Sequence, residues 1–512
     1  MPKKLSFLAF LALVFCQNTA GQSPVIRIKN PSFEGTPTTG MKYSALPGDW
    51  FDCGFPGETA PDVHPTSPVP SFDVTQRPLD GETYLGLITR ENNTWEAIGQ
   101  ELSSPFRTGV CYDFSIFLCR SASYFSPSRW KLNTFVNYVT PSILRIWGGS
   151  KSCAREELLA ESPPIFNFEW LPYDFRLQPT QPHTHLLIEI YYEMPERLTS
   201  GNILLDHASH IYEDSTCAEP SLFEFTRPMM GTEFRILLYA YDSLEALQSA
   251  MLAFRRVVEL EKIFSDYREN SEVSVLNEKA GNKQWVNASP EFIHLTRLAT
   301  GISKETDGAF DVSIGALTRL WRKAFRQQQF PDGEEIKAAA KTVGYRHIEF
   351  DKENKAIRLL TPGMRLDFGG IAKGYAVDQA LRELQKMGIH SALVDGGGDI
   401  AAGSAPPGKD GWTIEYTAPG KNGPEKATVL IKNVAVATSG DTYRYLEWEG
   451  KRYSHIIDPR TGMGLTKRRI VTVFALDCTQ ADAMATAISV GISDRLQKKL
   501  EKEGFWISTV EE

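Results

Sequence analysis

Hydrophobic positions divide the chain into two parts with different patterns. From residue 24 to about residue 215, short apolar or aromatic runs alternate with clusters of Pro, Gly, Ser and Thr, as in CYDFSIFLC at 111–119 and LLIEIYY at 186–192. Runs of this length and spacing predict β-strands, and patterns typical of helices are nearly absent. Residues 24–215 therefore predict an all-β domain, a sandwich of the jelly-roll type.

After a boundary at residues 216–222, the pattern changes to mixed α and β. Asp242 begins a capping-box sequence, which predicts the start of a helix. One face of this helix consists of Leu244, Leu247, Met251, Phe254 and Val258. A further helix over 374–387 ends at Gly388. Its predicted inward residues are Val377, Leu381 and Leu384. Residues 223–512 therefore predict an α+β domain, and 512 residues are enough for two domains.

The first 22 residues have the composition of a signal peptide. Two lysines precede an apolar run from Leu5 to Cys16, which is too short to span a bilayer. Small residues before Gln22 predict cleavage there, and the mature protein is then expected in the periplasm or cell envelope. Lipidation at Cys16 is the alternative, although Phe15 occupies a position where such a site requires a small residue.

Net charge and cysteine usage limit the function classes. The formal charge of −8 argues against general nucleic-acid binding, which requires a basic surface. Six cysteines follow Cys16, five of them before residue 220, and an exported protein can join them in disulfides. The odd number leaves the pairing open. The sequence has no C-x-x-C, so it gives no support for a zinc or redox motif of that kind.

Segments near the two ends of the first domain carry a resemblance. NPSFE at 30–34 and LDHAS at 205–209 resemble the first and last strands of galactose-binding-like, carbohydrate-binding modules. The wider region is similar to a domain of envelope proteins from Bacteroidetes. The resemblance implies that this domain binds a glycan or another envelope component.

Two features of this domain each allow two interpretations. Glu34 and Asp206 would share a structural Ca²⁺ if the first and last strands pair, and are otherwise polar residues at strand ends. The tryptophans would form a platform for sugar stacking, or else belong to the core. They are Trp50, Trp95, Trp130, Trp147 and Trp170.

Asp482 and Thr486 are four residues apart in a predicted helix, so their side chains lie on one face. A carboxylate and a hydroxyl at this spacing suit Mg²⁺, which takes few protein ligands and completes its shell with water and substrate oxygens. Neighbouring alanines leave the helix thin enough for another backbone to approach. The alternative is an Asp that caps a neighbouring segment and a Thr that bonds to its own helix.

Further polar motifs follow predicted strands. DFGGIAKGY at 367–375 runs from a strand end into a helix, where glycines permit close backbone approach and a helix N-terminus favours phosphate. Lys373 adds a cation there. GGG at 396–398 provides another close approach or a plain tight turn. His455, in HIIDPRTG, suits a general base that acts on a hydroxyl at neutral pH, or a structural hydrogen bond.

These motifs belong to an ordered series that resembles the ApbE family, the FAD:protein FMN transferases, over residues 223–512. The series consists of MGT (230–232), SDY (265–267), SEV (271–273), GAFD (308–311), LW (320–321), DFGGIAKGY (367–375), DGGGD (395–399), ATSGD (437–441), HIIDPRTG (455–462) and ADAMAT (481–486). The resemblance implies a two-lobed α+β domain with FAD bound between the lobes.

By position in these motifs, the resemblance implies that the main-chain carbonyl of Ala372 joins Asp482 and Thr486 at Mg²⁺, and that His455 is needed for catalysis. The residues implied to contact FAD are Met230, Tyr267, Ala309, Phe310, Asp311, Asp367 and Lys373. The implied reaction attaches FMN through a phosphoester to a Thr or Ser hydroxyl of an acceptor protein and releases AMP. Two alternatives remain: an FAD pyrophosphatase, and an envelope glycan-binding protein whose ApbE-like half is inert.

Overall fold

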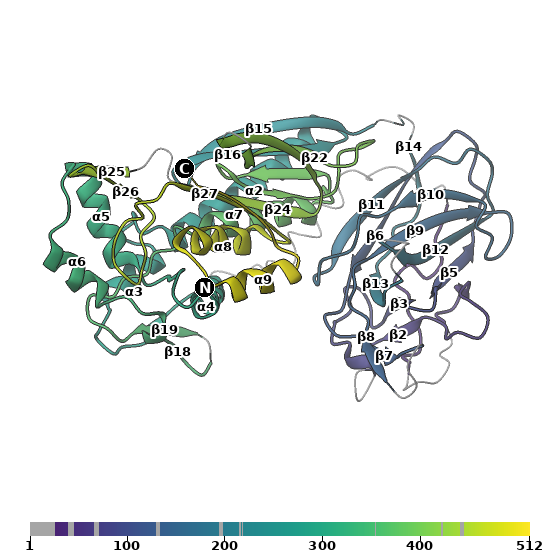
Figure 1. The fold of residues 1–512 in the computed structure, drawn as a ribbon. Helices are drawn as coiled ribbons and strands as arrows, with labels where there is room; N and C mark the ends of the chain where they lie inside the picture. The colour runs from purple at the N-terminus through teal and green to yellow at the C-terminus, as the bar shows by residue number, and fades with distance from the viewer. Residues whose placement is uncertain are drawn as a thin grey trace, which may run out of the picture. The chain divides into compact units, whose positions relative to one another are not determined.

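The computed structural model describes residues 26–38, 46–65, 71–129, 134–193, 198–214, 217, 219–353, 355–420, 423–440 and 445–511. The predicted signal peptide, the alternative lipidation site at Cys16 and the side chain of Trp130 lie outside these residues. The chain forms two compact units, Met1–Glu219 and Pro220–Glu512 (Figure 1). In the described part of the chain, no helix has the length and apolar character needed to cross a membrane.

The first unit consists of antiparallel strands in two sheets that share a core. One sheet has the strand order β1 (Phe51–Asp52), β5 (Ala97–Glu101), β12 (His185–Tyr192), β9 (Ser142–Gly149) and β10 (Glu157–Glu161). The other has the order β11 (Leu171–Leu177), β6 (Cys111–Cys119), β13 (Gly201–Asp206), β3 (Tyr84–Arg90) and β2 (Asp62–His64), with β14 (Tyr212–Asp214) on β6 and β4 (Thr94–Trp95) on β3. A short 3₁₀ turn, η1 (Ser71–Asp73), and the hairpin of β7 (Phe125–Pro127) and β8 (Phe135–Asn137) complete the unit. Because alternate side chains point to opposite faces of a strand, Leu87, Ile116 and Ile188 lie in one buried core. The predicted all-β sandwich is confirmed.

Two disulfides connect distant parts of the first unit, Cys53–Cys153 and Cys111–Cys217. They join residues 100 and 106 positions apart. In the chain-entropy account, closing a loop of that length stabilises the folded state by about 4–5 kcal/mol. Cys119 and Cys478 are buried free thiols. This pairing is the one that the cysteine count left open.

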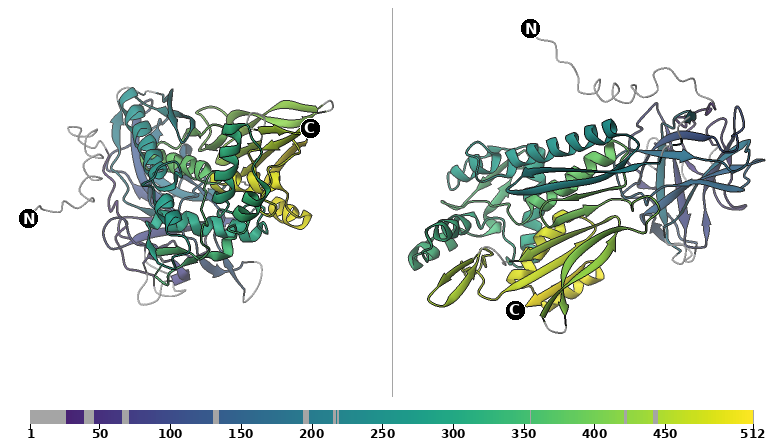
Figure 2. Two further views of the ribbon diagram at one scale, coloured as in Figure 1. Left: turned by 90° about the vertical axis from the view of Figure 1, so that its left-hand side faces the viewer. Right: turned by 90° about the horizontal axis from the view of Figure 1, so that it is seen from above.

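The second unit is organised around a seven-stranded antiparallel sheet. Its strand order is β15 (Ser221–Met229), β16 (Thr232–Ala240), β20 (Ala392–Asp395), β21 (Asp399–Ala402), β24 (Val434–Gly440), β27 (Arg469–Ala475) and β28 (Trp506–Glu511). The helices α2 (Ser243–Phe264), α7 (Ala372–Lys386) and α8 (Cys478–Val490) share one core with one face of this sheet (Figures 1 and 2). On the other face, the hairpin of β22 (Trp412–Gly420) and β23 (Gly423–Ile431) packs its Trp412 and Ile414 against Leu393 and Phe474.

A smaller lobe of this unit has its own apolar cluster. It contains α5 (Gly315–Gln327), α6 (Gly333–Ala340) and the hairpin of β25 (Tyr445–Trp448) and β26 (Lys451–Ser454). The remaining elements are α3 (Glu272–Glu278), α4 (Pro290–Glu305), η2 (Tyr345–His347), α9 (Asp494–Lys502) and the small sheet β17 (Val286–Asn287), β19 (Ala356–Leu359) and β18 (Ile348–Phe350). The predicted α+β fold with two lobes is confirmed.

Helix α2 begins as predicted but packs on a different face. The Asp242 carboxylate accepts hydrogen bonds from the amides of Leu244 and Glu245, so the N-cap is confirmed. Of the predicted apolar face, only Phe254 is buried, whereas the rest is exposed, including Leu244 at 62% and Met251 at 50%. The buried side is rich in small residues, namely Ala246, Ser249, Ala250, Ala253, Phe254, Val257, Leu260 and Phe264. Small side chains let α2 approach α7 closely, and this contact decides which face is buried.

Candidate functional site

The first turn of α7 lies directly against α8. The amide of Gly374 donates to Asp482 Oδ2 at 3.1 Å. A Cβ atom at Gly374 would lie 2.3 Å from the Cys478 carbonyl oxygen, so only glycine permits this approach. A Cβ atom at Gly370 would lie 3.0 Å from Thr486 Oγ1, which places the glycine loop beside that hydroxyl. The structure therefore brings Asp482, Thr486 and the backbone around Ala372 together, and their role as metal ligands stays a prediction.

The charges around Asp482 favour a bound cation. Asp482 is buried, and burial followed by the like charge of Asp399 raises its pKa to about 7. The Lys373 ammonium forms an ion pair with Asp399, which is also buried. No group of three or more His, Cys, Asp or Glu side chains in the described residues forms a metal site. One carboxylate, a hydroxyl and nearby carbonyls fit Mg²⁺, which takes few protein ligands.

The start of α7 is suited to bind an anion. The preceding residue, Ile371, provides no side-chain cap, and the first-turn amide of Gly374 donates to Asp482 on α8 instead. The Asp367 carboxylate instead orders the turn before it by accepting from the Gly369 amide at 2.8 Å. The amides of Ala372 and Gly374 are already bonded, to the Phe368 carbonyl and to Asp482, so the feature that favours a phosphate here is the positive end of the helix dipole. Lys373 lies in the same turn, although the structure pairs it with Asp399.

Arg322 connects two predicted site residues and was missed from the sequence. Its guanidinium pairs with Asp266 and with Asp367, the latter at 2.8 Å, and its Cζ lies 4.7 Å from the ring centroid of Tyr267. Thr318 Oγ1, one helical turn earlier, donates to Asp367 at 2.6 Å. Tyr267 is 78% exposed, so much of its ring is free to contact a planar ligand. The sequence placed Arg322 next to the LW motif but carried no sign of these distant partners.

The GAFD segment lies inside the protein. Ala309, Phe310 and Asp311 are all buried. The Asp311 carboxylate accepts from the Ser313 amide and hydroxyl at 2.8 and 2.6 Å, and from the Tyr345 amide at 3.1 Å, so it orders its own loop. Burial raises the pKa of Asp311. The FAD contacts predicted for these three residues stay predictions.

Met230 occupies the tight turn between β15 and β16. Its φ is 48° and that of Gly231 is 76°, values that a two-residue hairpin turn requires at both central positions. A Cβ atom at Gly397 would lie 2.0 Å from Thr232 Oγ1, so the GGG loop packs against the end of this turn. Asp395 Oδ1 accepts from the amides of Gly397 and Gly398, each at 2.9 Å. The predicted MGT and DGGGD motifs are thus neighbours, separated by more than 160 residues in sequence.

His455 is exposed in the loop that follows β26. This loop is held by a β-bridge between Ile457 and Gly464 and by the Trp321 indole, which donates to the Gly462 carbonyl at 2.9 Å. Arg460 extends toward the end of α8, where its guanidinium lies 3.5 Å from the Gly491 carbonyl. The backbone around His455 is therefore held by contacts on either side of it.

In the first unit, Glu34 and Asp206 hold the same turn. Glu34 Oε1 accepts from the amides of Glu82 and Thr83 at 2.8 and 3.3 Å, and Asp206 Oδ2 accepts from those of Leu79 and Asp80 at 2.7 and 3.1 Å. Burial raises the pKa of Asp206 to about 6. The carboxylates thus contact backbone donors that would repel a cation, and the shared Ca²⁺ stays a prediction.

The described tryptophans of this unit are anchored by hydrogen bonds. Trp50 is buried, and its indole donates to the Asn30 carbonyl at 3.0 Å. The indoles of Trp95 and Trp147 both donate to Glu189, and that of Trp170 donates to the Arg77 carbonyl. These contacts favour the core interpretation for Trp50 and a structural polar cluster for the pair around Glu189.

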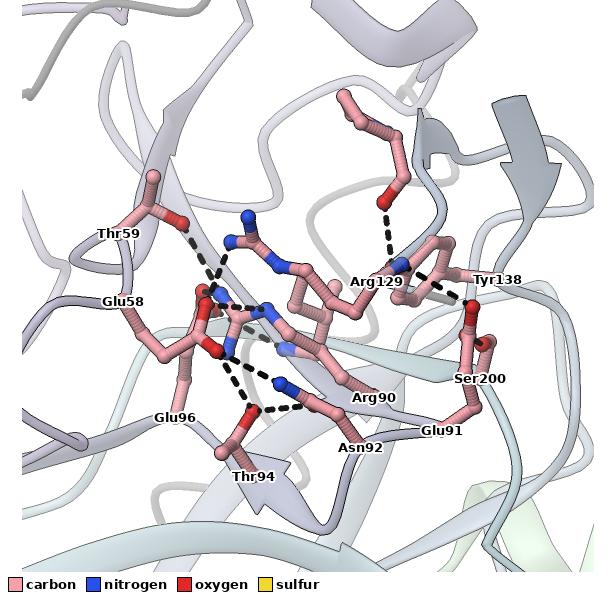
Figure 3. A network of polar contacts seen from close by, with 12 residues as sticks. Glu58, Thr59, Arg90, Glu91, Asn92, Thr94, Glu96, Arg129, Tyr138 and Ser200 are labelled. Carbon is pink, nitrogen blue, oxygen red and sulfur yellow. Dashed lines mark hydrogen bonds and ion pairs between the residues drawn. The ribbon is translucent and has the colours of Figure 1, made fainter. Parts of the chain in front are cut away.

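A second buried polar network lies around Arg90 (Figure 3). Its guanidinium pairs with Glu96 and lies 3.6 Å from Glu58, and Arg129 pairs with the same Glu58 at 2.5 Å. Burial raises the pKa of Glu96 to about 8. Because its members come from separate loops and from β3, the network fixes these segments relative to one another.

The second unit is similar to known proteins in both sequence and fold. Residues 230–505, over half of the chain, match the model of the ApbE family. A FAD:protein FMN transferase of Klebsiella pneumoniae (strain 342) is 31% identical over 269 residues, which cover 52% of this chain and 82% of that protein. The crystal structure of the ApbE protein from Thermotoga maritima is 31% identical with a TM-score of 0.52, covering 57% of this chain and 94% of that one. A xylan-binding CBM22 domain from Paenibacillus barcinonensis aligns with 38% of this chain over 97% of its own length. The sequence identity is 13% and the TM-score is 0.22. The ordered motifs, the two-lobed fold and the family match together show that this chain belongs to the ApbE family.

Proposed function

We propose that this chain is a Mg²⁺-dependent FAD:protein FMN transferase. The observation that carries the proposal is that Asp482 and Thr486 of α8 lie beside the glycine loop and the first turn of α7. A cation bound at Asp482 would offset the burial that disfavours its ionised form, and the start of a helix favours phosphate, so the two suit a metal–pyrophosphate complex. The curated relatives of the second unit carry the same activity in their name.

In the proposed reaction, a Thr or Ser hydroxyl of the acceptor attacks the FMN-side phosphorus of FAD. A new O–P bond forms, the pyrophosphate P–O bond breaks, and AMP leaves with the bonding electron pair. His455 removes the hydroxyl proton as the attack proceeds. Asp482, Thr486 and the Ala372 carbonyl would hold Mg²⁺, which neutralises charge on the pyrophosphate when bound. Tyr267 stacks on a planar ring of FAD, and the start of α7 orients the phosphates.

The test is to incubate the full chain with FAD, Mg²⁺ and a Thr-containing peptide, and to follow AMP release and FMN attachment by mass spectrometry. Transfer of FMN to the peptide supports the proposal. FMN and AMP without peptide attachment would identify an FAD pyrophosphatase, because water would then replace the hydroxyl at the same residues. No FAD cleavage would leave the glycan-binding alternative with an inert ApbE-like half.

We also propose that the protein acts in the periplasm or cell envelope and that its first unit binds a glycan or envelope component. The signal-peptide composition of residues 1–22 supports export. The two disulfides support an oxidising compartment. N-terminal sequencing tests export, since a chain that begins near Gln22 supports it and an unprocessed Met1 opposes it. Binding of the first unit on a glycan array tests the second proposal.

A further inference from the structure

A groove between α5 and α6 carries unpaired positive charge. The groove measures about 450 Å³. Its lining residues are Ala316, Arg319, Leu320, Lys323, Arg326, Glu335, Ala338 and Ala339. Arg319, Lys323 and Arg326 are exposed along one ridge of α5, at positions i, i+4 and i+7. Glu335 is the single acidic residue among those that line it.

These three cations differ from the neighbouring Arg322. Arg322 is neutralised by Asp266 and Asp367, whereas no carboxylate of the described chain lies within 4.0 Å of the cationic groups of Arg319, Lys323 or Arg326. Burial and then the like charge of Arg319 lower the pKa of Arg365, which places a further cation near Arg319. A basic groove on a protein with a net charge of −8 is a local feature with a strong preference for an anionic partner.

The groove lies in the lobe that holds His455. Leu317 and Trp321 of α5 and Ile336 of α6 share an apolar cluster with Ile457, two residues after His455. Trp321 also donates to the Gly462 carbonyl at the end of the same loop. The adjacent ridge of α5 carries Thr318 and Arg322, which contact Asp367 in the candidate FAD site. A polypeptide bound in the groove therefore contacts the lobe that contains His455. Only the width of α5 separates it from Asp367 in the candidate FAD site.

We infer that the α5–α6 groove docks an acidic segment of the acceptor protein and so presents its hydroxyl to the transfer site. Acidic side chains of this segment pair with Arg319, Lys323 and Arg326, and an apolar side chain packs on Leu320 and Ala339. The inference rests on the proposed transferase function and names a surface for its protein substrate. Pairs of this kind contribute mainly specificity and association rate, because each exposed pair is weak.

The test uses two fluorescein-labelled peptides of equal length, one with Glu and Leu around a single Thr, the other with each Glu replaced by Lys. Anisotropy measures their binding to the full chain, to the variant R319E/K323E/R326E, and to the control R495E/K498E/K502E. The control reverses three exposed cations on α9. We expect the acidic peptide alone to bind, with salt-dependent affinity. The groove variant should bind it about 10- to 100-fold more weakly, and the α9 variant should bind it normally.

FAD cleavage, measured separately by AMP release, should be the same in all three proteins, because the reversed residues contact neither Asp367 nor Asp482. Equal loss of peptide binding in both variants, or none in the groove variant, overturns the inference. Vesicles of phosphatidylglycerol that bind through the groove while the acidic peptide does not would also overturn it, in favour of a membrane surface. The wild-type chain could also bind the acidic peptide through the groove and yet cleave no FAD. That result would support the docking groove and refute the proposed transferase function.

Discussion

Replacing Arg322 by Met should weaken both the second unit and its hold on FAD. The guanidinium separates two carboxylates, Asp266 and Asp367, and backs the ring of Tyr267 at 4.7 Å. Breaking a fully buried ion pair costs about 3–5 kcal/mol. The Arg322 side chain is 32% exposed, so a discounted loss of about 2–3 kcal/mol in unfolding free energy is expected. Loss of the cation–π contact accounts for a further ~0.5–1 kcal/mol.

The same variant should depend on pH in a direction that the charges fix. Burial followed by the like charge of Asp367 already raises the pKa of Asp266, and Arg322 opposes this rise. Without Arg322 the pKa of Asp266 rises further, so the folded variant takes up a proton more readily than the unfolded chain. Its stability deficit relative to wild type should then shrink as pH falls from neutral toward the acidic range, where protonation removes the repulsion.

Urea unfolding at neutral and acidic pH measures the stability, with the second unit identified as the transition that FAD shifts. A fluorescence titration measures FAD affinity, which should fall about threefold to tenfold as Tyr267 loses its backing. Arg319→Met, an exposed neighbour on α5, is the matched control and should change unfolding free energy by less than about 0.5 kcal/mol. Wild-type stability and affinity in Arg322→Met would refute the view that the guanidinium organises this side of the site.

Three further outcomes follow from the site. Asp482→Ala should abolish Mg²⁺-dependent FAD cleavage, whereas Thr486→Ala should reduce it less, because water can replace a neutral hydroxyl; wild-type rates for Asp482→Ala at saturating Mg²⁺ would remove the metal assignment. His455→Ala should slow FMN transfer about 100- to 10,000-fold while FAD affinity stays near wild type, and a parallel drop in affinity would assign it to binding instead of proton transfer. Burial and the like charge of Asp477 raise the pKa of Asp378 from 3.8 to about 7, so its contribution to stability should decline as pH rises through that window and level off above it; denaturation of Asp378→Asn should lack this decline.

The sequence was informative where function depends on local spacing. Asp482 and Thr486 are one helical turn apart, so a single helix suffices to place them together, and the inward residues Val377, Leu381 and Leu384 of α7 are buried as predicted. It failed where two distant segments decide the outcome. Arg322 contributes to the site through its ion pairs with Asp266 and Asp367, which lie 56 and 45 positions away in the sequence.

The prediction of the buried face of α2 was wrong for a related reason. It has two sides that could pack, one with Leu244, Leu247 and Met251, the other with small residues in its first half, from Ala246 to Ala253, and larger apolar residues after them. Hydrophobic periodicity selects the larger side chains, but close contact with α7 requires the smaller ones. Which side is buried is therefore a property of the partner helix, and α2 alone does not encode it. The disulfide pairing is similar, since the paired cysteines are 100 and 106 positions apart and come together only through the arrangement of distant strands.

Helix α5 is the element that links the two halves of the proposed chemistry. Thr318 and Arg322 connect it to Asp367, which orders the glycine loop before the metal and phosphate site on α7 and α8. Trp321, on a neighbouring face of α5, holds the loop of His455 through the Gly462 carbonyl. The proton acceptor and the phosphate site are thus built on different apolar clusters, and α5 makes contacts to both. A substitution that loosens α5 should therefore affect FAD binding and hydroxyl activation together, whereas replacing Thr486 on α8 should act mainly through the proposed metal.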